Sequence, residues 1–462
     1  MSGSLAKRWL DYWLYKAKWL YPGMRVKRWL FLAVLGALLS GLGVIITTQE
    51  KILSFLENKI LQASIWSFGS FAFWAGLLTI ALGIAIMLLG IRKSLGSIMD
   101  AVFPERDFGF AEAVFQKRHL QRGPRIVVVG GGTGLSVLLK GLKKYTSNIT
   151  AIVTVADDGG SSGRLRGELG ILPPGDIRNC MVALAEPEAL MDELFQYRFP
   201  DGKTLEGHSM GNLLLAAMTN LTGSFDRAIK AMSKVLAIRG QVLPSTLENI
   251  TLRAETGDGK VVVGESAISA CGQAIKRVAL EPEDCKPLPE ALQAIKEADL
   301  VVLGPGSLYT SVLPNLLISE IAAELKAAKG AKVYVCNIMT QPGETEGYGA
   351  ADHVQAILDH VGPGVVEHVI VNIEEVPKRL VKKYLERGAR PVRSERKKLE
   401  KMGLQVVPEK LVYESDLVRH HPDKLSRAII GLLFRTKAQQ EAAGVLDFYL
   451  LGEWFKDRGQ GK

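Results

Sequence analysis

Two long stretches near the start of the chain contain no Asp, Glu, Lys or Arg. They cover residues 29–48 and 65–91, and each is long enough to cross a bilayer once as a helix. A secretory signal peptide would have a shorter basic region and a small-residue cleavage site, and no second apolar stretch would follow it. We therefore expect a transmembrane hairpin, with a helical hairpin buried in a soluble protein as the alternative.

A different pattern begins at residue 125, where short apolar runs alternate with longer segments of mixed polarity. Consecutive apolar positions are typical of strands buried on both faces, as in parallel sheets covered by helices. Such runs lie at 125–129, 149–155, 299–303, 332–336 and 367–371. Residues 247–264 instead predict a β-hairpin that turns at 257–259. The pattern predicts an α/β fold with a mostly parallel sheet and helices on both of its faces.

These patterns divide the chain into six parts. They are a basic N-terminal segment (1–28), two transmembrane helices (29–48 and 65–91), a juxtamembrane linker (92–124), an α/β domain (125–436) and a C-terminal helix or tail (437–462).

Charge separates the same parts. Residues 1–122 hold 15 Lys/Arg against 7 Asp/Glu, whereas the rest of the chain holds 42 against 41. Because the basic residues flank the outer ends of the two apolar stretches, both termini and the α/β domain are expected in the cytoplasm, at the cell membrane. The α/β domain shows no overall basic excess for nucleic acid. The four cysteines form no CxxC pair, which fits a reducing compartment and argues against a structural zinc site.

Ligands of open α/β sheets bind at the carboxyl ends of the strands, so the residues after each predicted strand are candidates. The first strand leads into a glycine-rich turn of Gly130, Gly131, Gly132, Thr133 and Gly134. Such a turn lets a phosphate approach the amides of a helix N-terminus. It lacks the third glycine of the dinucleotide motif and the lysine of a P-loop. A phosphorylated ligand and a purely structural turn are both compatible with it.

An acidic loop follows the second strand. Asp157 and Asp158 precede a run of glycines, two hydroxyl side chains and an arginine. A carboxylate here can bind a ribose hydroxyl, hold a divalent cation or act as a base, and Ser161, Ser162 and Arg164 can contact phosphate oxygens. Neighbouring side chains at a strand end point in different directions, so we expect one of the two aspartates to meet the ligand. A simple Asp-Gly turn is the alternative.

Further loops of the same character add candidate binding residues. These are Asp176, Asn179, His208, Asn212, Gly304, Gly306, Ser307, Tyr309 and Asn337. Tyr309 can stack on a base or sugar, whereas His208 fits a helix cap as well as an acid–base group. The pairs Asp352-His353 and His420-His421 have no third metal ligand at a recognisable spacing, and we expect them at the solvated surface. No Ser-His-Asp order, HExxH or paired CxxC motif supports a serine hydrolase or a zinc enzyme.

Six motifs occur in a fixed order and together closely resemble the YvcK family, the so-called gluconeogenesis factors. They are VVGGGTGLSVLLKGLK, TVADDGGSSGRLR, LPPGDIRN, GHSMGNL, LGPGSLYTSVLPNLL and CNIMTQPGETEGY. The resemblance covers about residues 125–435 and extends to CofD, a 2-phospho-L-lactate transferase of coenzyme F420 synthesis. It implies a Rossmann-like fold and the binding of nucleotide sugars, notably UDP-N-acetylglucosamine. It also implies a role in cell shape and cell-wall homeostasis on gluconeogenic carbon sources.

The resemblance also implies roles for individual residues. The glycine turn, Asp157 and Asp158 would line the nucleotide, and Asn212 and Tyr309 would contact the base or sugar. A binding protein of this kind requires no cofactor; a retained CofD-like transferase would hold Mg²⁺ on Asp157 or Asp158. The expected partners are a UDP-sugar, the membrane and a cell-wall or regulatory protein, with no nucleic acid and with a homo-oligomer left open.

Three functions therefore stand side by side. The first is a regulatory binding protein that senses a UDP-sugar, and the second is a metal-dependent transferase. The third, an NAD-dependent dehydrogenase, rests on the glycine turn alone and lacks both the third glycine and a clear catalytic His or Lys.

Overall fold

The computed structural model describes residues 27–57, 66–102, 120–186, 189–200, 205–414 and 417–440. Most of the predicted basic segment before residue 27 and the predicted tail after residue 440 lie outside these residues. The chain divides into two units, Met1–Lys117 and Arg118–Lys462, and each is described by itself.

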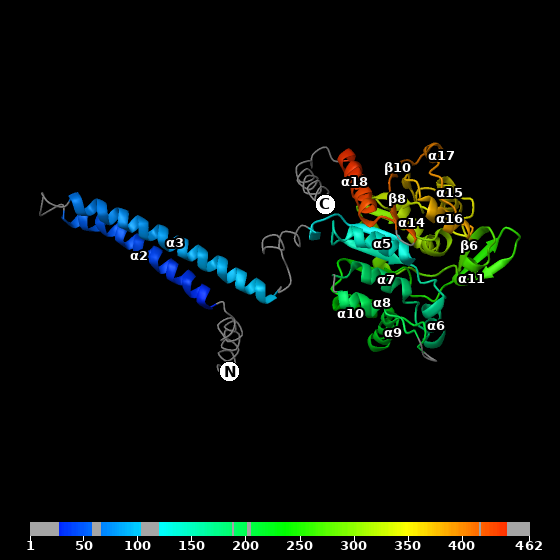
Figure 1. Cartoon of the computed structure of the whole chain (residues 1–462), viewed down its shortest axis with the longest axis horizontal. Coiled ribbons are helices and arrows are strands. Elements are labelled where there is room, and N and C mark those ends of the chain that lie inside the picture. Colours follow the sequence, from blue (N-terminus) through cyan, green and yellow to red (C-terminus); the bar gives the residue numbers. More distant parts are fainter. Residues whose placement is uncertain are drawn as a thin grey trace. The chain divides into compact units, whose positions relative to one another are not determined.

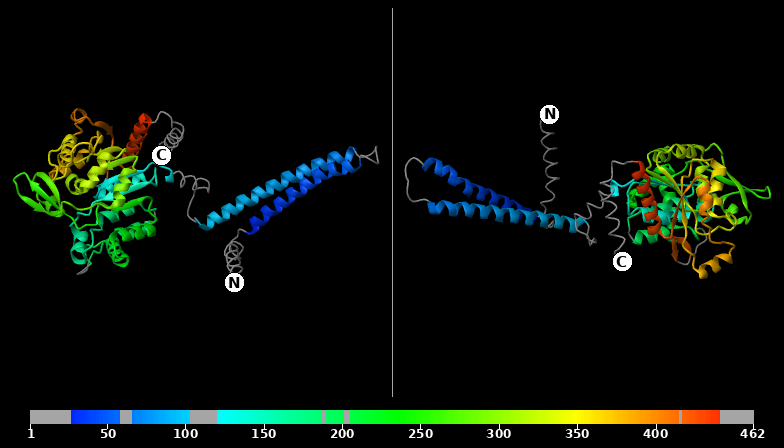
Figure 2. Two further views of the ribbon diagram at one scale, coloured as in Figure 1. Left: turned by 180° about the vertical axis from the view of Figure 1, so that it is seen from behind. Right: turned by 90° about the horizontal axis from the view of Figure 1, so that it is seen from above.

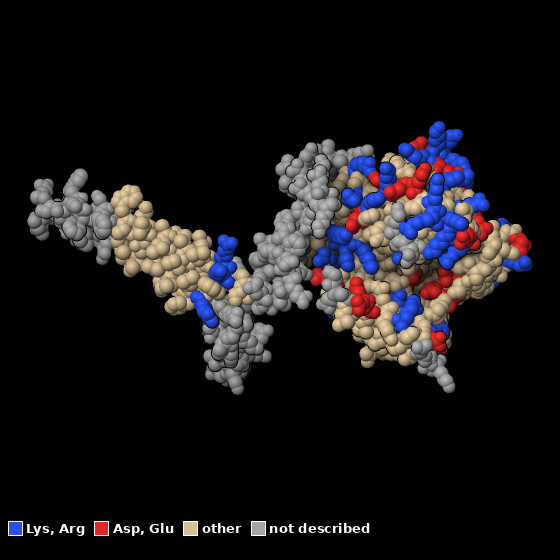
Figure 3. Space-filling view, in the orientation of Figure 1, with Lys and Arg blue, Asp and Glu red and all other residues tan. Residues whose placement is uncertain are grey.

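The first unit contains two long apolar helices, α2 (Lys27–Glu57) and α3 (Trp66–Val102), which lie side by side (Figures 1 and 2). The stretches Arg28–Thr47 and Phe73–Ser94 are long and apolar enough to cross a membrane, as predicted. In the space-filling view their described surface is almost free of charge except for a few Lys and Arg side chains at one end (Figure 3).

Glycines on matching faces let α2 and α3 approach closely. Gly36 and Gly43 in α2 are seven residues apart, as are Gly76, Gly83 and Gly90 in α3. A Cβ atom on Gly43 would lie 2.9 Å from the carbonyl oxygen of Gly76, and one on Gly83 would lie 2.7 Å from that of Gly36. Small residues at a helix–helix contact are typical of membrane helices, because the backbones pack directly.

The second unit is built on a seven-stranded sheet in which every neighbouring pair is parallel. Its order is β10-β9-β8-β7-β1-β2-β3. The strands are β1 (Ile126–Gly130), β2 (Ile149–Val153), β3 (Gln241–Pro244), β7 (Leu300–Leu303), β8 (Ala331–Val335), β9 (His368–Asn372) and β10 (Gln405–Glu409). The five predicted strands are confirmed as β1, β2, β7, β8 and β9, whose residues are almost all buried. The edge strands β3 and β10 were not predicted.

Helices cover both faces of this sheet. They are α5 (Gly132–Leu142), α6 (Gly160–Leu169), α7 (Gly175–Leu184), α8 (Ala189–Gln196), α9 (Met210–Thr222), α10 (Phe225–Val235), α12 (Pro289–Lys296), α13 (Leu313–Leu316), α14 (Ser319–Ala327), α15 (Ala350–Val361), α16 (Lys378–Leu385), α17 (Arg396–Lys401) and α18 (Pro422–Gln440), with a π-helical turn η2 (Leu308–Val312). Helix α5 packs against α7 and α18, and the cyan α5 lies beside the red α18 in Figure 2. Helix α12 packs against α14, and α13 against α15. The chain winds in opposite directions from β1 and from β7. Right-handed crossovers therefore place the group of α5, α7 and α18 on one face of the sheet and the group of α12, α13, α14 and α15 on the other. The predicted α/β class is confirmed.

A small antiparallel sheet projects from one side of this unit (Figure 1). Its strands are β4 (Thr251–Thr256), β5 (Val261–Val263) and β6 (Ile275–Glu281), in the order β5-β4-β6. The predicted hairpin is confirmed as β4–β5, and the short helix α11 (Glu265–Ala270) follows it directly. A second hairpin, β11 (Val412–Glu414) and β12 (Val418–His420), precedes α18.

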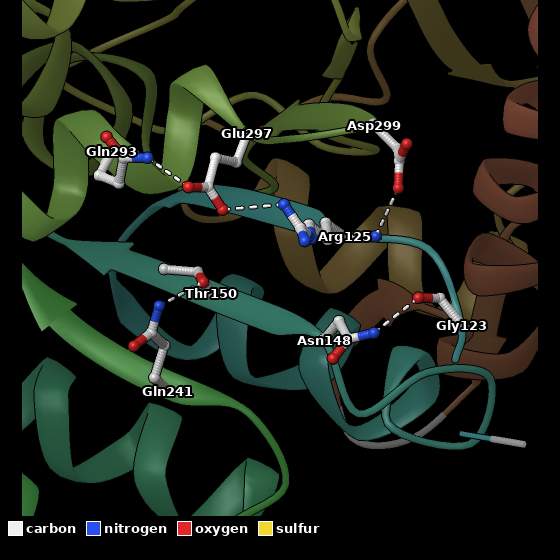
Figure 4. Close-up of polar contacts among 8 residues, drawn as sticks. All are labelled: Gly123, Arg125, Asn148, Thr150, Gln241, Gln293, Glu297 and Asp299. Atoms are coloured by element: carbon white, nitrogen blue, oxygen red, sulfur yellow. Dashed lines mark hydrogen bonds and ion pairs between the residues drawn. The ribbon is translucent and has the colours of Figure 1, made fainter. Parts of the chain in front are cut away.

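Polar contacts hold the amino ends of the central strands together (Figure 4). The Arg125 amide donates to Asp299 at 2.7 Å, and its guanidinium donates to Glu297 at 2.8 Å. On the other side, the Gln241 amide donates to the Thr150 hydroxyl at 2.8 Å. These contacts tie β7 to β1 and β2 to β3 at the edge opposite the candidate site.

Candidate functional site

The strand order reverses between β1 and β7. From β1 the chain winds to β2 and β3 on one side, and from β7 it winds to β8, β9 and β10 on the other. Open α/β sheets bind ligands in the crevice at such a switch point, outside the carboxyl ends of the strands. A cavity of about 480 Å³ lies there, within the usual range for small-molecule sites.

Both glycine turns line this cavity, one after β1 (131–134) and one after β7 (305–307). The other polar lining residues are Thr154, Asp157, Asp176, Glu265, Thr310, Ser311, Asn337, Thr340, Gln341, Tyr384, Arg419 and His420. The structure therefore brings together predicted residues from five separate loops.

The first glycine turn is tight for two reasons. Gly132 has a φ of +68°, a conformation that favours glycine. A Cβ atom on Gly134 would lie 2.7 Å from the carbonyl oxygen of Pro305, so glycine is what lets the two turns meet. The Gly132 amide donates to Asp176 Oδ2 at 2.6 Å, which fixes the start of α5 against α7.

Three carboxyl groups, from Asp157, Asp176 and Glu265, lie on one side of the cavity. Burial raises the pKa of Asp176 to about 6, although the Gly132 amide and Arg178 work against the rise. Burial, reinforced by Asp157 and Glu344, raises the pKa of Glu265 to about 7. Near neutral pH Glu265, and to a smaller extent Asp176, therefore hold part of their protons, which lessens the negative charge that an anionic ligand would meet.

The structure distinguishes the two neighbouring aspartates. Asp157 lines the cavity, whereas Asp158 is turned away and accepts a hydrogen bond from the Ser266 amide of α11 at 2.9 Å. Among the described residues, no three His, Cys, Asp or Glu side chains gather closely enough to hold a metal ion by themselves. Mg²⁺ commonly uses one or two carboxylates together with phosphate oxygens, and Asp157 with Asp176 fits that kind of ion.

Several predicted residues lie beneath the cavity wall. Ser161 Oγ accepts a hydrogen bond from Asn212 Nδ2 at 3.1 Å and is bonded to His208 Nδ1 at 3.0 Å, and all three side chains are buried. This network joins the start of α6 to the start of α9, and Ser162 is buried beside it. The structure therefore assigns these residues to holding the acidic loop.

Three other predicted residues also lie outside the cavity lining. Arg164 donates to the carbonyl oxygen of Glu206 at 2.5 Å, and Asn179 accepts from Arg178 at 2.7 Å. Tyr309 is 2% exposed, and its hydroxyl is hydrogen-bonded to that of Tyr348 at 2.8 Å. Its ring therefore supports η2, whose next residues Thr310 and Ser311 line the cavity. Gly130 is the last residue of β1, and Gly304 directly follows β7.

Some lining residues carried no signal in the sequence. Glu265 comes from α11, between strands β5 and β6 of the small sheet, and Arg419 and His420 come from β12. Of the two pairs expected at the solvated surface, Asp352 is exposed and His421 is half-buried. The expectation was wrong for His353 and His420, which are 0% and 7% exposed. His420 Nε2 donates to the Cys336 carbonyl at 3.1 Å, and burial lowers its pKa to about 4, so it is neutral near pH 7.

Comparison with known proteins shows which family the chain belongs to. The family profile of 2-phospho-L-lactate transferase CofD matches residues 126–412. A Bacillus subtilis protein named gluconeogenesis factor is 55% identical over 67% of this chain and 98% of its own length. This chain belongs to the CofD-related family of gluconeogenesis factors. The predicted family is thereby confirmed.

Relatives of two lengths occur in this family. A crystal structure from Bacillus halodurans, 54% identical, superposes with a TM-score of 0.66 over 67% of this chain and 100% of its own. The α/β unit of these relatives therefore folds without helices such as α2 and α3. A family member from Clostridium acetobutylicum is 42% identical over 95% of this chain and 96% of its own length, so that match extends into the two apolar helices.

Proposed function

We propose that this gluconeogenesis-factor family member binds a nucleotide sugar such as UDP-N-acetylglucosamine and regulates cell-wall and shape homeostasis through that binding. The observation that carries the proposal is the meeting of two glycine turns, each leading into a helix, in one polar cavity at the switch point of the sheet.

The cavity offers separate groups for the parts of such a ligand. Apart from the Gly132 amide, which donates to Asp176, the amides in the first turn of α5 have no acceptor within their own helix, and such amides bind phosphate groups in other α/β proteins. Ser307, Thr310 and Asn337 add hydroxyl and amide groups, and Arg419 is the one Lys or Arg among the lining residues described. The carboxylates on the acidic side are acceptors for sugar hydroxyls.

A transferase like CofD is the second candidate, and it is favoured by the family profile and by the position of Asp157 in the cavity. There Asp157 and Asp176 would hold Mg²⁺, which would neutralise phosphate charge. Glu265, whose pKa is raised to about 7, is the group that could move a proton near neutral pH. In the regulatory function, by contrast, the ligand leaves unchanged.

The proposed location is the cytoplasmic face of the cell membrane, with α2 and α3 as a two-helix anchor. It rests on the length and apolar character of both helices and on the basic residues outside them. There the cavity would meet the cytoplasmic pool of nucleotide sugars that serves wall synthesis.

Calorimetric titration tests the proposal on the unit Arg118–Lys462, with UDP-N-acetylglucosamine and GDP, each with and without magnesium. Asn337→Ala should weaken UDP-sugar binding about tenfold, because its side-chain amide holds the second glycine turn by donating to the Gly306 carbonyl at 2.8 Å, and because a hydrogen bond to a charged group contributes about 1.5 kcal/mol. Asn220→Ala, on the exposed surface of α9, is the matched control and should bind as the wild type does.

Absence of UDP-sugar binding under both conditions would refute the sensor. Release of a nucleoside monophosphate when a deazaflavin alcohol is supplied, and only with magnesium, would instead establish the transferase. Binding without any turnover is the expected result.

A further inference from the structure

One segment of the second unit carries a large excess of positive charge. Residues 378–401, which contain α16, α17 and the loop between them, hold 11 Lys/Arg against 3 Asp/Glu. The rest of the chain from residue 123 onward holds 31 against 38. The near balance of the whole unit therefore conceals one strongly basic region within an acidic remainder.

The eleven cations form what we call the basic surface. They are Lys378, Arg379, Lys382, Lys383, Arg387, Arg390, Arg393, Arg396, Lys397, Lys398 and Lys401, and all of them are exposed. Figure 3 shows Lys and Arg side chains gathered over the region where Figure 1 labels α16 and α17. Glu395 pairs with Lys398 at 2.6 Å and lies 3.8 Å from Arg393, so one carboxylate serves two of the cations. Three acids cannot balance eleven bases, so a strong positive potential remains.

We propose that the basic surface docks on the anionic headgroups of the lipid bilayer. Helix α16 turns Leu380 inward and exposes its lysines, with Leu385 at its end 48% exposed. A basic amphipathic helix with an exposed leucine is typical of proteins that lie on membranes. Binding to headgroup phosphates requires positive charge but little shape complementarity, and each Lys or Arg near an anionic leaflet adds to the attraction.

The composition of the segment argues against nucleic acid. Proteins that bind single strands combine basic residues with exposed aromatic rings on which the bases stack. The one aromatic residue between positions 378 and 401 is Tyr384, which is half-buried and lines the cavity. A bilayer requires no such stacking.

The basic surface is continuous with one wall of the ligand cavity. The Tyr384 hydroxyl accepts a hydrogen bond from the Val418 amide at 3.0 Å, and both residues line the cavity. In the loop after α16, the Arg390 amide donates to Thr340 Oγ1 at 2.9 Å, and the Thr340 amide donates to the Arg390 carbonyl at 2.8 Å. Docking on lipid would therefore act on the same elements that shape the cavity, whatever ligand the cavity takes.

The test is sedimentation of the unit Arg118–Lys462 with vesicles, which needs neither α2 nor α3. Vesicles of phosphatidylcholine alone are compared with equal mixtures of phosphatidylcholine and phosphatidylglycerol, between about 0.05 and 0.5 M NaCl, where the Debye length shortens from above 10 Å to below 8 Å. The variant reverses three charges, as Lys382→Glu, Arg387→Glu and Lys397→Glu. The control makes the same change in net charge at exposed lysines elsewhere, as Lys140→Glu, Lys296→Glu and Lys329→Glu.

The wild type and the control should bind the mixed vesicles at low salt, leave them at high salt and ignore phosphatidylcholine. The variant at the basic surface should bind at least about tenfold more weakly, because each reversed charge acts close to the leaflet. Equal losses in both variants, or no wild-type binding at low salt, would overturn the proposal. Tight binding of an RNA or DNA oligomer would also overturn the proposal. The same holds if the variant loses only UDP-sugar affinity while the wild type binds no vesicles. Unchanged circular dichroism in both variants guards against misfolding.

Discussion

The close approach of the two glycine turns predicts that Gly134→Ala destabilises the α/β unit. The Cβ of an alanine at this position would lie 2.7 Å from the carbonyl oxygen of Pro305 and 3.0 Å from its carbonyl carbon. Ordinary contact begins at 3.4 Å, so the oxygen would have to retreat by about 0.7 Å. Because both atoms belong to the backbone, no side-chain rotation can relieve the overlap.

Overpacking of this kind costs about 1–3 kcal/mol. Within a helix, alanine is also more stabilising than glycine by about 0.5–1 kcal/mol, which offsets part of the steric cost. Gly167→Ala in α6 isolates that gain, since no atom lies within 4 Å of the new Cβ. The steric cost is therefore the difference between the two variants, about 1–3 kcal/mol in free energy of unfolding.

Urea unfolding of Arg118–Lys462, followed by far-ultraviolet circular dichroism, measures both variants. Gly167→Ala should move the midpoint above that of the wild type, and Gly134→Ala should move it below. If the two variants unfolded at the same urea concentration, the turns would not be packed as tightly as the geometry requires, and the argument for one shared site would weaken.

Three further predictions use the same unfolding assay. Asp176→Asn should raise the urea midpoint at pH 8 and leave it unchanged at pH 4. The pKa of Asp176 is about 6 in the folded state and 3.8 ordinarily, so the folded state binds the proton more tightly. The wild type therefore loses stability as the pH rises through that interval, and the asparagine variant does not. An equal shift at both pH values would contradict this. Tyr309→Phe should cost about 1–2 kcal/mol, because the half-buried Tyr348 hydroxyl loses its partner, and an unchanged midpoint would show that water replaces it. Leu139→Ala, at a fully buried position of α5, should cost about 2–5 kcal/mol, whereas Leu221→Ala, 81% exposed, should stay within about 0.5 kcal/mol; similar losses would refute the assigned packing.

Much of the sheet could be predicted because its central strands are buried on both faces. The residues of β1 and β7 are apolar at nearly every position, and a parallel sheet gives that pattern directly. The edge strands give a weaker pattern. Strand β3 begins with an exposed Gln241, and β10 contains Pro408, so neither forms a continuous apolar run.

The site was predictable as far as it follows those central strands. The turns after β1 and β7 were found, but Glu265 and Arg419 reach the cavity from hairpins far along the chain. Nothing in their own sequence marks them, since their approach depends on how the hairpins pack. The side chains of Asp157 and Asp158 could not be told apart for the same reason: the Ser266 amide that turns Asp158 away lies 108 residues later.

The position of β1 between β2 and β7 has a consequence for synthesis of the chain. Strand β2 follows β1 closely, but the contact between Arg125 and Asp299 spans 174 residues. At about 5–20 residues per second, the ribosome needs about 9–35 s to add that length. Throughout that interval one edge of β1 lacks its neighbour, and an unpaired apolar edge is prone to pair with other chains. This edge of β1 is therefore open to wrong pairing before the cavity exists, and folding should be slow because the contacts that complete the sheet are so distant in the sequence.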